Sequence, residues 1–254
     1  MDLKNIIPSG RYRGLATFSD IHSHAEKLKG GIRYALKNNL FIVFLGDLVD
    51  GHDKPLETVL TVKQILDAGT GALVIGNHDD KFYRYAKGNP VILKKQNKQT
   101  LKDIPDGQEP LFLPTITDLV THKNASHHWE YDNWVFIHGS CHEEIWASPA
   151  ELSTKAKHRA LYGEVTGETG EDGMPVRLYN WVDEIPSGRG VVVGHDRKPY
   201  GGETLADTGP FDHTNDQGGR VIFSDTGCGK GGKLTLTVFS FEGDGIEQVG
   251  YETL

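Results

Sequence analysis

The sequence predicts an α/β fold built from layered sheets and helices. Two observations predict it: short apolar runs rich in β-branched and aromatic residues recur along the chain, and apolar residues at helical spacing fill the gaps between the first runs. Strands that alternate with helices in the opening third are typical of a layered α/β domain. Apolar residues make up 37% of the 254 residues and charged residues 24%, as expected for a chain that buries a core.

Six apolar runs have the length and composition of buried strands. They occupy residues 15–18, 41–45, 72–75, 134–137, 191–193 and 221–223. Residues 25–38 and 56–68 place apolar side chains on one helical side, and Gly69 follows the second segment as a C-terminal signal. Near the end, alternation in 233–239 and 246–251 indicates antiparallel strands.

The periodic pattern weakens in the middle of the chain, where lysines and then prolines replace the regularly spaced apolar residues. We predict a single domain over residues 1–254, in which 84–130 forms a cap or insertion. Residues 163–175 are rich in glycine and acidic residues, and we expect an extended loop there.

Composition excludes several classes of protein. The formal net charge of -8 argues against broad binding to a nucleic acid backbone, so we expect no stable nucleic acid complex. Cys141 and Cys228 are too few for a disulfide framework, and the chain shows no signal-peptide pattern, so we expect a cytoplasmic protein. No apolar stretch approaches the roughly 20 residues of a membrane helix, so we expect no membrane partner.

Polar residues that can bind metal follow five of the six apolar runs. Open α/β sheets generally bind ligands at this end of their strands. In chain order these residues are Asp20 and His22, Asp47 and Asp50, Asn77 with His78 and Asp79, His138, and His195.

This mixture of carboxylates and imidazoles suits Mn, Fe or Zn better than an all-oxygen calcium site. Asp20 and His22 are expected to point the same way because they alternate in an extended segment. A carboxylate on a Gly-Asp turn such as Gly46-Asp47 can bridge two metal ions. The sequence therefore predicts a site for two ions.

The order of these residues resembles the calcineurin-like metallophosphoesterase superfamily, whose pattern runs D-x-H, G-D-x-x-D, G-N-H-[ED], H and G-H. The second motif resembles its phosphoprotein phosphatase branch, which includes protein Ser/Thr phosphatases, symmetrical dinucleoside tetraphosphatases and bacterial RNA-repair phosphatase domains. Residues 159–177 and 225–235 are similar to the RNA-repair type, and the resemblance spans about 16–240, apart from 84–130.

This resemblance implies a β-sandwich flanked by helices with a dinuclear centre at the strand ends. It implies that Asp20, His22 and Asp47 hold one ion, and that Asp47, Asn77, His138 and His195 hold the other. Mn is the expected metal, with Fe, Zn or Ni as alternatives, and the nucleophile is a metal-bound hydroxide. His78 matches the catalytic histidine of the superfamily and Asp50 the carboxylate that orients it.

The chain departs from the pattern where many relatives carry a phosphate-binding arginine. Gly51 and His52 follow Asp50 in place of Arg-Gly, so we assign substrate binding to Arg197 and Arg159. Asp225 fits two roles equally well, as a turn-capping residue or as a hydrogen-bond partner of a ligand histidine.

The first functional hypothesis is a phosphomonoesterase acting on a phosphoprotein, a nucleotide or an RNA end. The alternative enzyme is a phosphodiesterase or dinucleoside polyphosphate hydrolase, which the missing arginine favours because a diester carries less charge to bind. The third hypothesis, from another class, is a non-catalytic scaffold with the same fold.

Overall fold

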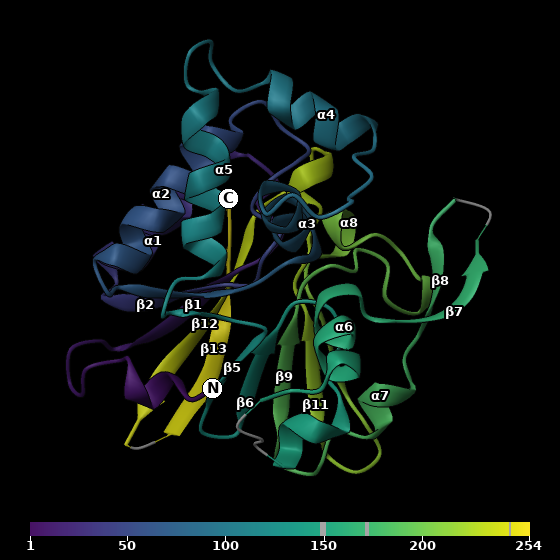
Figure 1. The fold of residues 1–254 in the computed structure, drawn as a ribbon. Helices are drawn as coiled ribbons and strands as arrows, with labels where there is room; N and C mark the ends of the chain where they lie inside the picture. The colour runs from purple at the N-terminus through teal and green to yellow at the C-terminus, as the bar shows by residue number, and fades with distance from the viewer. Residues whose placement is uncertain (148–150, 171–172, 244) are drawn as a thin grey trace.

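The computed structural model of the protein describes residues 1–147, 151–170, 173–243 and 245–254. Strands form two sheets and a separate hairpin, and helices cover the outer faces of both sheets (Figure 1). Among the described residues, none of the helices combines the length and the apolar character needed to cross a membrane.

The first sheet has the strand order β13-β12-β1-β2-β3-β4. Its strands are β1 (Gly14–Phe18), β2 (Leu40–Phe44), β3 (Gly71–Val74), β4 (Ala125–Ser126), β12 (Thr235–Glu242) and β13 (Gly245–Thr253). The strands β1 to β4 run parallel, whereas β12 pairs antiparallel with both β1 and β13. The antiparallel pair predicted near the end of the chain is therefore confirmed.

The second sheet has the order β10-β11-β9-β6-β5. Its strands are β5 (His128–Tyr131), β6 (Trp134–Ile137), β9 (Gly190–Val193), β10 (Phe211–Thr214) and β11 (Arg220–Phe223). The central strands β6, β9 and β11 run parallel. Each of the six predicted apolar runs is thus a strand, and together they form the middle of the two sheets.

Helices pack on both outer faces. Those of the chain are α1 (Ala25–Lys37), α2 (Pro55–Asp67), α3 (Asn77–Ala86), α4 (Lys95–Lys102), α5 (Glu109–Val120), α6 (Thr154–Tyr162), α7 (Asn180–Asp183) and α8 (Leu205–Thr208). Short 3-10 turns are η1 (Leu3–Asn5), η2 (Glu143–Ala147), η3 (Pro199–Gly201) and η4 (Cys228–Lys230). Figure 1 shows α1, α2 and α5 beside the first sheet and α6 and α7 beside the second.

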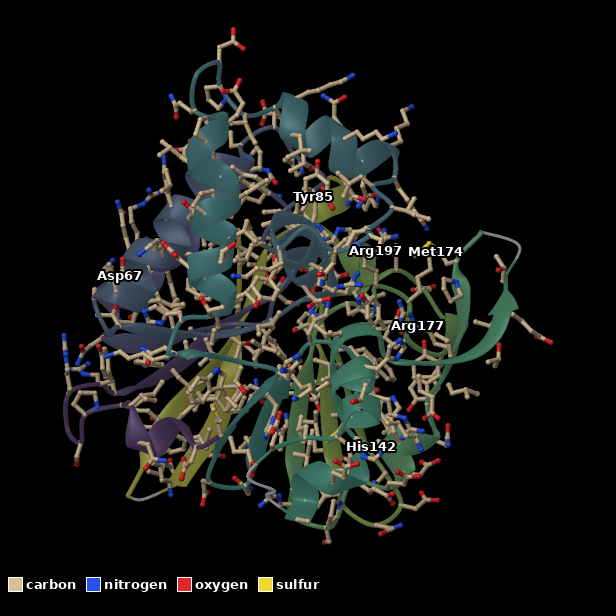
Figure 2. The ribbon with its side chains drawn as sticks, in the orientation of Figure 1. Asp67, Tyr85, His142, Met174, Arg177 and Arg197 are labelled. Atoms are coloured by element: carbon tan, nitrogen blue, oxygen red, sulfur yellow. The ribbon has the colours of Figure 1, made fainter. Side chains whose placement is uncertain are left out.

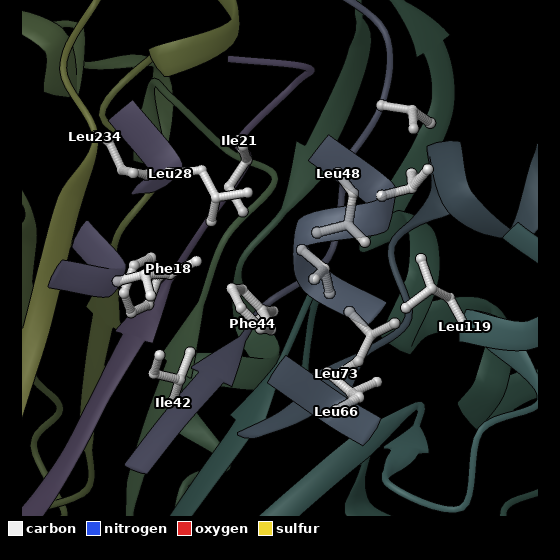
Figure 3. Packing of buried hydrophobic residues seen from close by; sticks show 14 of the residues in the cluster. Phe18, Ile21, Leu28, Ile42, Phe44, Leu48, Leu66, Leu73, Leu119 and Leu234 are labelled. Carbon is white, nitrogen blue, oxygen red and sulfur yellow. The ribbon is translucent and has the colours of Figure 1, made fainter. Parts of the chain in front are cut away.

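The layers follow from the alternation of side chains along each strand. In β2, Ile42 and Phe44 face the helices α1 and α2 (Figure 3), whereas Phe41 and Val43 face the opposite sheet. In β9, Val192 lies between the sheets, and its two neighbours pack against α6 and α7. Both faces of these strands are buried, which explains why the sequence shows continuous apolar runs there. The predicted β-sandwich flanked by helices is confirmed.

Residues 163–175 differ from the expected loop. Their described part forms an antiparallel hairpin of β7 (Glu164–Thr169) and β8 (Pro175–Leu178), with residues 171–172 outside the described part. Most of its side chains are exposed. A strand with two exposed faces lacks the apolar alternation by which strands are recognised, so the sequence did not indicate it.

Residues 84–130 contribute to several layers. The helix α5 packs against α2 and α3, while β4 joins the first sheet and β5 the second. The helix α4 lies at the end of the molecule where the parallel strands terminate (Figure 1). The single-domain organisation with 84–130 as a cap or insertion stays a prediction.

Phe239 provides a test of the packing between the sheets. Its ring is fully buried and makes edge contacts with Trp134 and Phe136 of the opposite sheet, at centroid distances of 4.9 and 5.6 Å. We expect Phe239→Ala to lower the free energy of unfolding by about 3–5 kcal/mol, because it leaves a cavity between two rigid sheets. Val249→Ala on the exposed β13 edge is the control and should change it by less than about 0.5 kcal/mol. Urea denaturation measures both, and equal effects would contradict the layer assignment.

Candidate metal centre

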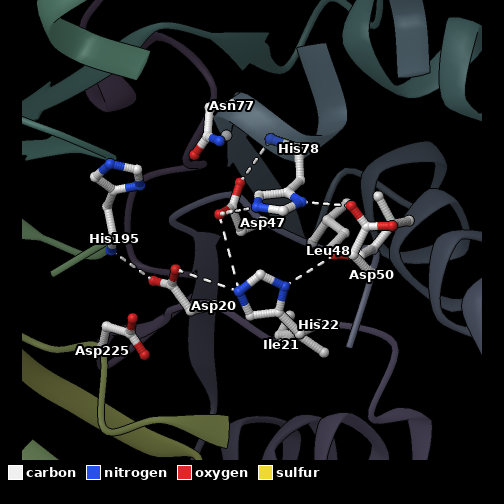
Figure 4. A network of polar contacts seen from close by, with 12 residues as sticks. Asp20, Ile21, His22, Asp47, Leu48, Asp50, Asn77, His78, His195 and Asp225 are labelled. Atoms are coloured by element: carbon white, nitrogen blue, oxygen red, sulfur yellow. Dashed lines mark hydrogen bonds and ion pairs between the residues drawn. The ribbon is translucent and has the colours of Figure 1, made fainter. Parts of the chain in front are cut away.

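The candidate centre lies where the parallel strands of both sheets end. The loops after β1, β2 and β3 approach the loops after β6 and β9, and these five loops carry all the predicted ligands. Figure 4 labels the ligands of four of these loops, those after β1, β2, β3 and β9. Parallel strands place their carboxyl ends at one edge of a sheet, so two sheets packed face to face can bring ligand groups from both sheets to one place. The structure brings the six predicted ligand residues together.

Asp20, His22 and Asp47 form the first group. Their ligand atoms lie within 4.8 Å of one another, and Nε2 of His22 is 3.9 Å from a carboxylate oxygen of each aspartate. The expected reason for this grouping was wrong. The segment is not extended, because Asp20 and His22 have left-handed φ angles of 52° and 48°, and the tight turn brings the two side chains to one side.

Asp47, His138 and His195 form the second group, again with ligand atoms within 4.8 Å of one another. Nε2 of His138 lies 3.4 Å from Oδ1 of Asp47 and 3.1 Å from Oδ1 of Asn77. The oxygen of Asp47 that faces His138 is not the one that faces His22. Asp47 therefore belongs to both groups, as a bridging carboxylate must.

Backbone carbonyls orient the three imidazoles. Nδ1 of His22 lies 2.9 Å from the carbonyl oxygen of Val49, and Nδ1 of His138 lies 2.7 Å from that of Leu45. Nε2 of His195 lies 3.2 Å from the carbonyl oxygen of Tyr162. A carbonyl only accepts, so each of these nitrogens donates its hydrogen, and the other ring nitrogen keeps a lone pair for a metal.

The charge balance of the site fits divalent cations. Asp20, Asp47, Asp79 and Asp225 are all buried. Burial and the nearby carboxylate of Asp47 raise the pKa of Asp79 to about 7, and burial and the nearby carboxylate of Asp20 raise the pKa of Asp225 to about 8. Buried carboxylates need compensation by hydrogen bonds or cations. With the nitrogen and oxygen donors above, the residues fit two divalent ions.

His78 lies beside the two groups and belongs to neither. Its Nδ1 is 2.5 Å from Oδ2 of Asp50, and its Nε2 is 3.8 Å from Oδ2 of Asp47. Burial by itself would lower the pKa of His78, but these two carboxylates outweigh it and raise the pKa to about 9. Since an imidazolium donates from both nitrogens, Asp50 keeps the Nε2 hydrogen directed toward the centre.

The carboxylate of Asp50 is held by two residues that sequence reasoning missed. Asn97 donates to Oδ2 at 2.6 Å and the Thr100 hydroxyl donates to Oδ1, and both residues come from α4. They lie in the weakly patterned segment 84–130, far from any recognised motif. Their polar side chains on the buried face of a short helix were the available signal.

Glycines allow the loops to approach one another. A Cβ on Gly194 would lie 2.3 Å from a carboxylate oxygen of Asp20, and a Cβ on Gly76 would lie 2.1 Å from the backbone nitrogen of Asp47. Distances this short leave no room for any other residue, so these two positions require glycine because of space.

The predicted substrate-binding arginines have different surroundings. Arg159 forms an ion pair with Glu164 and is not among the residues that line the cavity beside His195. Arg197, which is labelled in Figure 2, lines a cavity of about 560 Å³ that His195 also lines. Arg177 lines the same cavity, although the sequence did not predict it as a substrate-binding residue. The pKa of His195 is lowered mainly by burial and next by the positive charge of Arg177.

Asp225 shows the turn-capping role, because its Oδ1 accepts a hydrogen bond from the backbone nitrogen of Gly227 at 2.9 Å. It also lies near Asp20 and His22 (Figure 4). Burial lowers the pKa of His22, and the negative charge of Asp225 acts in the opposite direction and raises it. Asp79, one of the polar residues that follow the third apolar run, accepts hydrogen bonds from the backbone nitrogens of Gly76 and Leu48 and so fixes the start of α3.

Metal content tests the role of Asp47. Asp47→Asn should reduce the Mn bound per chain from two ions to one or fewer, because both groups lose a shared anionic ligand. His78→Gln should keep both ions, since His78 lies outside the groups. Inductively coupled plasma mass spectrometry after Mn loading and desalting gives the stoichiometry. Asp67→Asn on exposed α2 is the control (Figure 2), and equal metal loss in the Asp47 and His78 variants would contradict the assignment.

Comparison with known proteins agrees with the centre. The family model described as calcineurin-like phosphoesterase matches residues 15–199. An asymmetrical bis(5'-nucleosyl)-tetraphosphatase of Bacillus subtilis is 28% identical over 240 residues, covering 85% of this chain and 87% of that protein. One of the same name from Bacillus velezensis is 30% identical over 199 residues, covering 76% and 72%.

Solved structures show the same fold at lower identity. A protein serine/threonine phosphatase from Saccharomyces cerevisiae has a TM-score of 0.56 at 12% identity, over 99% of this chain and 81% of that chain. A cold-active protein-tyrosine phosphatase from Shewanella has a TM-score of 0.53 at 15% identity, over 96% and 80%. The predicted superfamily and the predicted class of enzyme, a metal-dependent phosphoester hydrolase, are confirmed, and the chain belongs to the calcineurin-like phosphoesterase family.

Proposed function

We propose that this enzyme hydrolyses dinucleoside polyphosphates at a pair of divalent ions. The observation that carries the proposal is the position of Asp47, whose two oxygens face ligand groups from different loops. The substrate class is supported by the bis(5'-nucleosyl)-tetraphosphatase names of the relatives and by a large cavity beside His195.

Residues of the two groups would share the ions. Asp20, His22 and Asp47 would hold one, and Asp47, Asn77, His138 and His195 the other. We propose Mn as the metal, because the site mixes carboxylate and amide oxygens with imidazole nitrogens. The proposed location is the cytoplasm, because Cys141 and Cys228 are free thiols, as expected in a reducing compartment.

The ions, when bound, would activate a water as nucleophile and neutralise charge on the phosphoryl oxygens. The chain itself supplies the remaining phosphate contacts. Arg177, Arg197 and Lys198 line the cavity next to His195, and a tetraphosphate bridge needs several such cations along its length. They compensate for the arginine that is missing after Asp50.

His78 would donate a proton to the leaving oxygen. Its Nε2 lies on the side of Asp47, and the Asp50 carboxylate holds the ring in place. The pair of His78 and Asp50 also favours a second candidate function, the hydrolysis of phosphomonoesters. An alkoxide leaving group needs a proton much more than a phosphate leaving group does.

A substrate comparison tests the proposed class. With Mn added, the enzyme should hydrolyse diadenosine tetraphosphate at least about tenfold more efficiently than a phosphoserine peptide, because only the former places several phosphates beside Arg177, Arg197 and Lys198. Chromatography of the products distinguishes asymmetrical cleavage into ATP and AMP from symmetrical cleavage into ADP. Chelation should abolish turnover and Mn should restore it. A preference for the phosphopeptide would overturn the proposal in favour of the second candidate.

The leaving group tests the role of His78. His78→Asn should reduce kcat about 10²–10⁴-fold for an alkyl phosphate monoester, the usual contribution of general acid catalysis. It should reduce kcat much less for diadenosine tetraphosphate, whose leaving group is a phosphate with a second pKa of about 6. Steady-state kinetics on both substrates with the wild type and the variant give the comparison. An equal loss on both would mean that His78 acts on the centre and not on the leaving group.

A further inference from the structure

We propose that Tyr200 is the stacking platform for a nucleobase of the substrate. The inference rests on the proposed function and assigns the wall of the cavity that lies beyond the phosphate contacts. It follows from the shape of the cavity, from the exposure of the Tyr200 ring and from its connection to the metal centre.

The cavity of about 560 Å³ falls within the range of about 300–1,000 Å³ that ligand pockets occupy. One wall is the hairpin, which contributes Met174, Val176 and Arg177, and the other is the segment after β9 with η3. Figure 2 labels Met174, Arg177 and Arg197, which lie near one another on facing segments. The lining combines apolar and aromatic surface with cations, the combination that a nucleotide requires.

Tyr200 has one face covered and much of its surface exposed. Its ring stacks on that of Tyr179 with centroids 4.2 Å apart and an interplanar angle of 27°. Phe211 and His213 lie against it at angles near edge-on, yet 48% of the residue remains exposed. Tyr200 is more exposed than Phe211 of the same cluster, which is 38% exposed, and Tyr200 lines the cavity whereas Phe211 does not. The exposed surface of a supported ring is the geometry on which bases stack.

The backbone of Tyr200 supports the same reading. Its φ and ψ of 57° and 22° are left-handed, a conformation that is costly for a bulky residue. Glycine would adopt it without strain, and glycines follow directly at 201 and 202. A tyrosine thus occupies a position whose left-handed backbone would favour glycine.

Asp196 links the platform to the phosphate contacts. Its Oδ2 accepts a hydrogen bond from the Tyr179 hydroxyl at 2.5 Å and lies 3.8 Å from Nε of Arg177. Its neighbour in sequence is the ligand candidate His195. One buried carboxylate therefore holds both the supporting ring of the platform and the guanidinium of Arg177, next to the ligand candidate His195. A nucleotide could therefore place its base on Tyr200 and its phosphates at Arg177 and Arg197 within this one cavity.

Binding measurements test this assignment. Calorimetric titration of the Mn-loaded wild type with AMP and with ribose 5-phosphate isolates the contribution of the base, and AMP should bind roughly 5- to 150-fold more tightly, as expected for one base stacked on an aromatic ring. Tyr200→Asn removes the ring and keeps a residue that tolerates a left-handed backbone, and it should abolish the difference. Tyr200→Phe should retain it, and Tyr200→Leu, which keeps apolar bulk without an aromatic face, should lose most of it.

Two results separate this inference from the proposed function. Equal binding of AMP and ribose 5-phosphate to the wild type, or an unchanged difference in Tyr200→Asn, would overturn the stacking platform, whatever the enzyme hydrolyses. Failure of the wild type to hydrolyse diadenosine tetraphosphate would overturn the proposed function, even where base-dependent binding is observed. Kinetics supply a further check: Tyr200→Asn should raise KM for diadenosine tetraphosphate more than KM for inorganic tripolyphosphate, which carries no aromatic ring to stack.

Discussion

The carboxylate of Asp47 faces histidines from three loops, and the rest of the centre is arranged around it. Its oxygens lie within 4 Å of His22, His78 and His138, which come from both sheets. Burial opposes ionisation of this carboxyl, but His138 and the other two imidazoles hold its pKa well below the usual range. A buried anion of this kind is stable only while its partners remain in place. The fold must therefore hold both sheets in a fixed register relative to each other.

The packing provides that register. The core has three apolar layers: one between the first sheet and its helices, one between the two sheets, and one between the second sheet and its helices. The middle layer contains aromatic rings in edge contact, such as those of Phe136 and Phe239. Close-packed layers resist sliding, because any shift would open cavities. At the strand ends, Gly76 and Gly194 allow loops from the two sheets to touch through backbone and carboxylate atoms. The loops of the candidate centre thus begin directly at the ends of packed strands, which limits how far they can move relative to one another.

Two parts of the chain outside the sheets complete the site. The helix α4 holds the Asp50 carboxylate through Asn97 and Thr100, and so controls the orientation of His78. On the other side, the hairpin supplies Arg177 to the cavity next to His195. Neither segment contributes a metal ligand. The candidate ligands thus come from the loops at the strand ends, whereas α4 and the hairpin contribute residues that surround them.

The sequence by itself determined the α/β layers, the strands of the sheet centres and the identity of the candidate ligands. Buried strands and ligand loops are local features: continuous apolar runs and the polar residues after them, such as Asp20, Asp47 and His138, are visible in a few consecutive residues. The tertiary structure decided what depends on contacts between distant segments. Four such features left no periodic signal in the sequence. They are the ion pair of Arg159 with Glu164, the hydrogen bonds of Asn97 and Thr100 to Asp50, the hairpin with two exposed faces, and the cavity that Arg177, Arg197 and Tyr200 line together. The physical reason is that a side chain's charge partner and exposure are set by neighbours far away in the chain, which only the packed layers bring into contact.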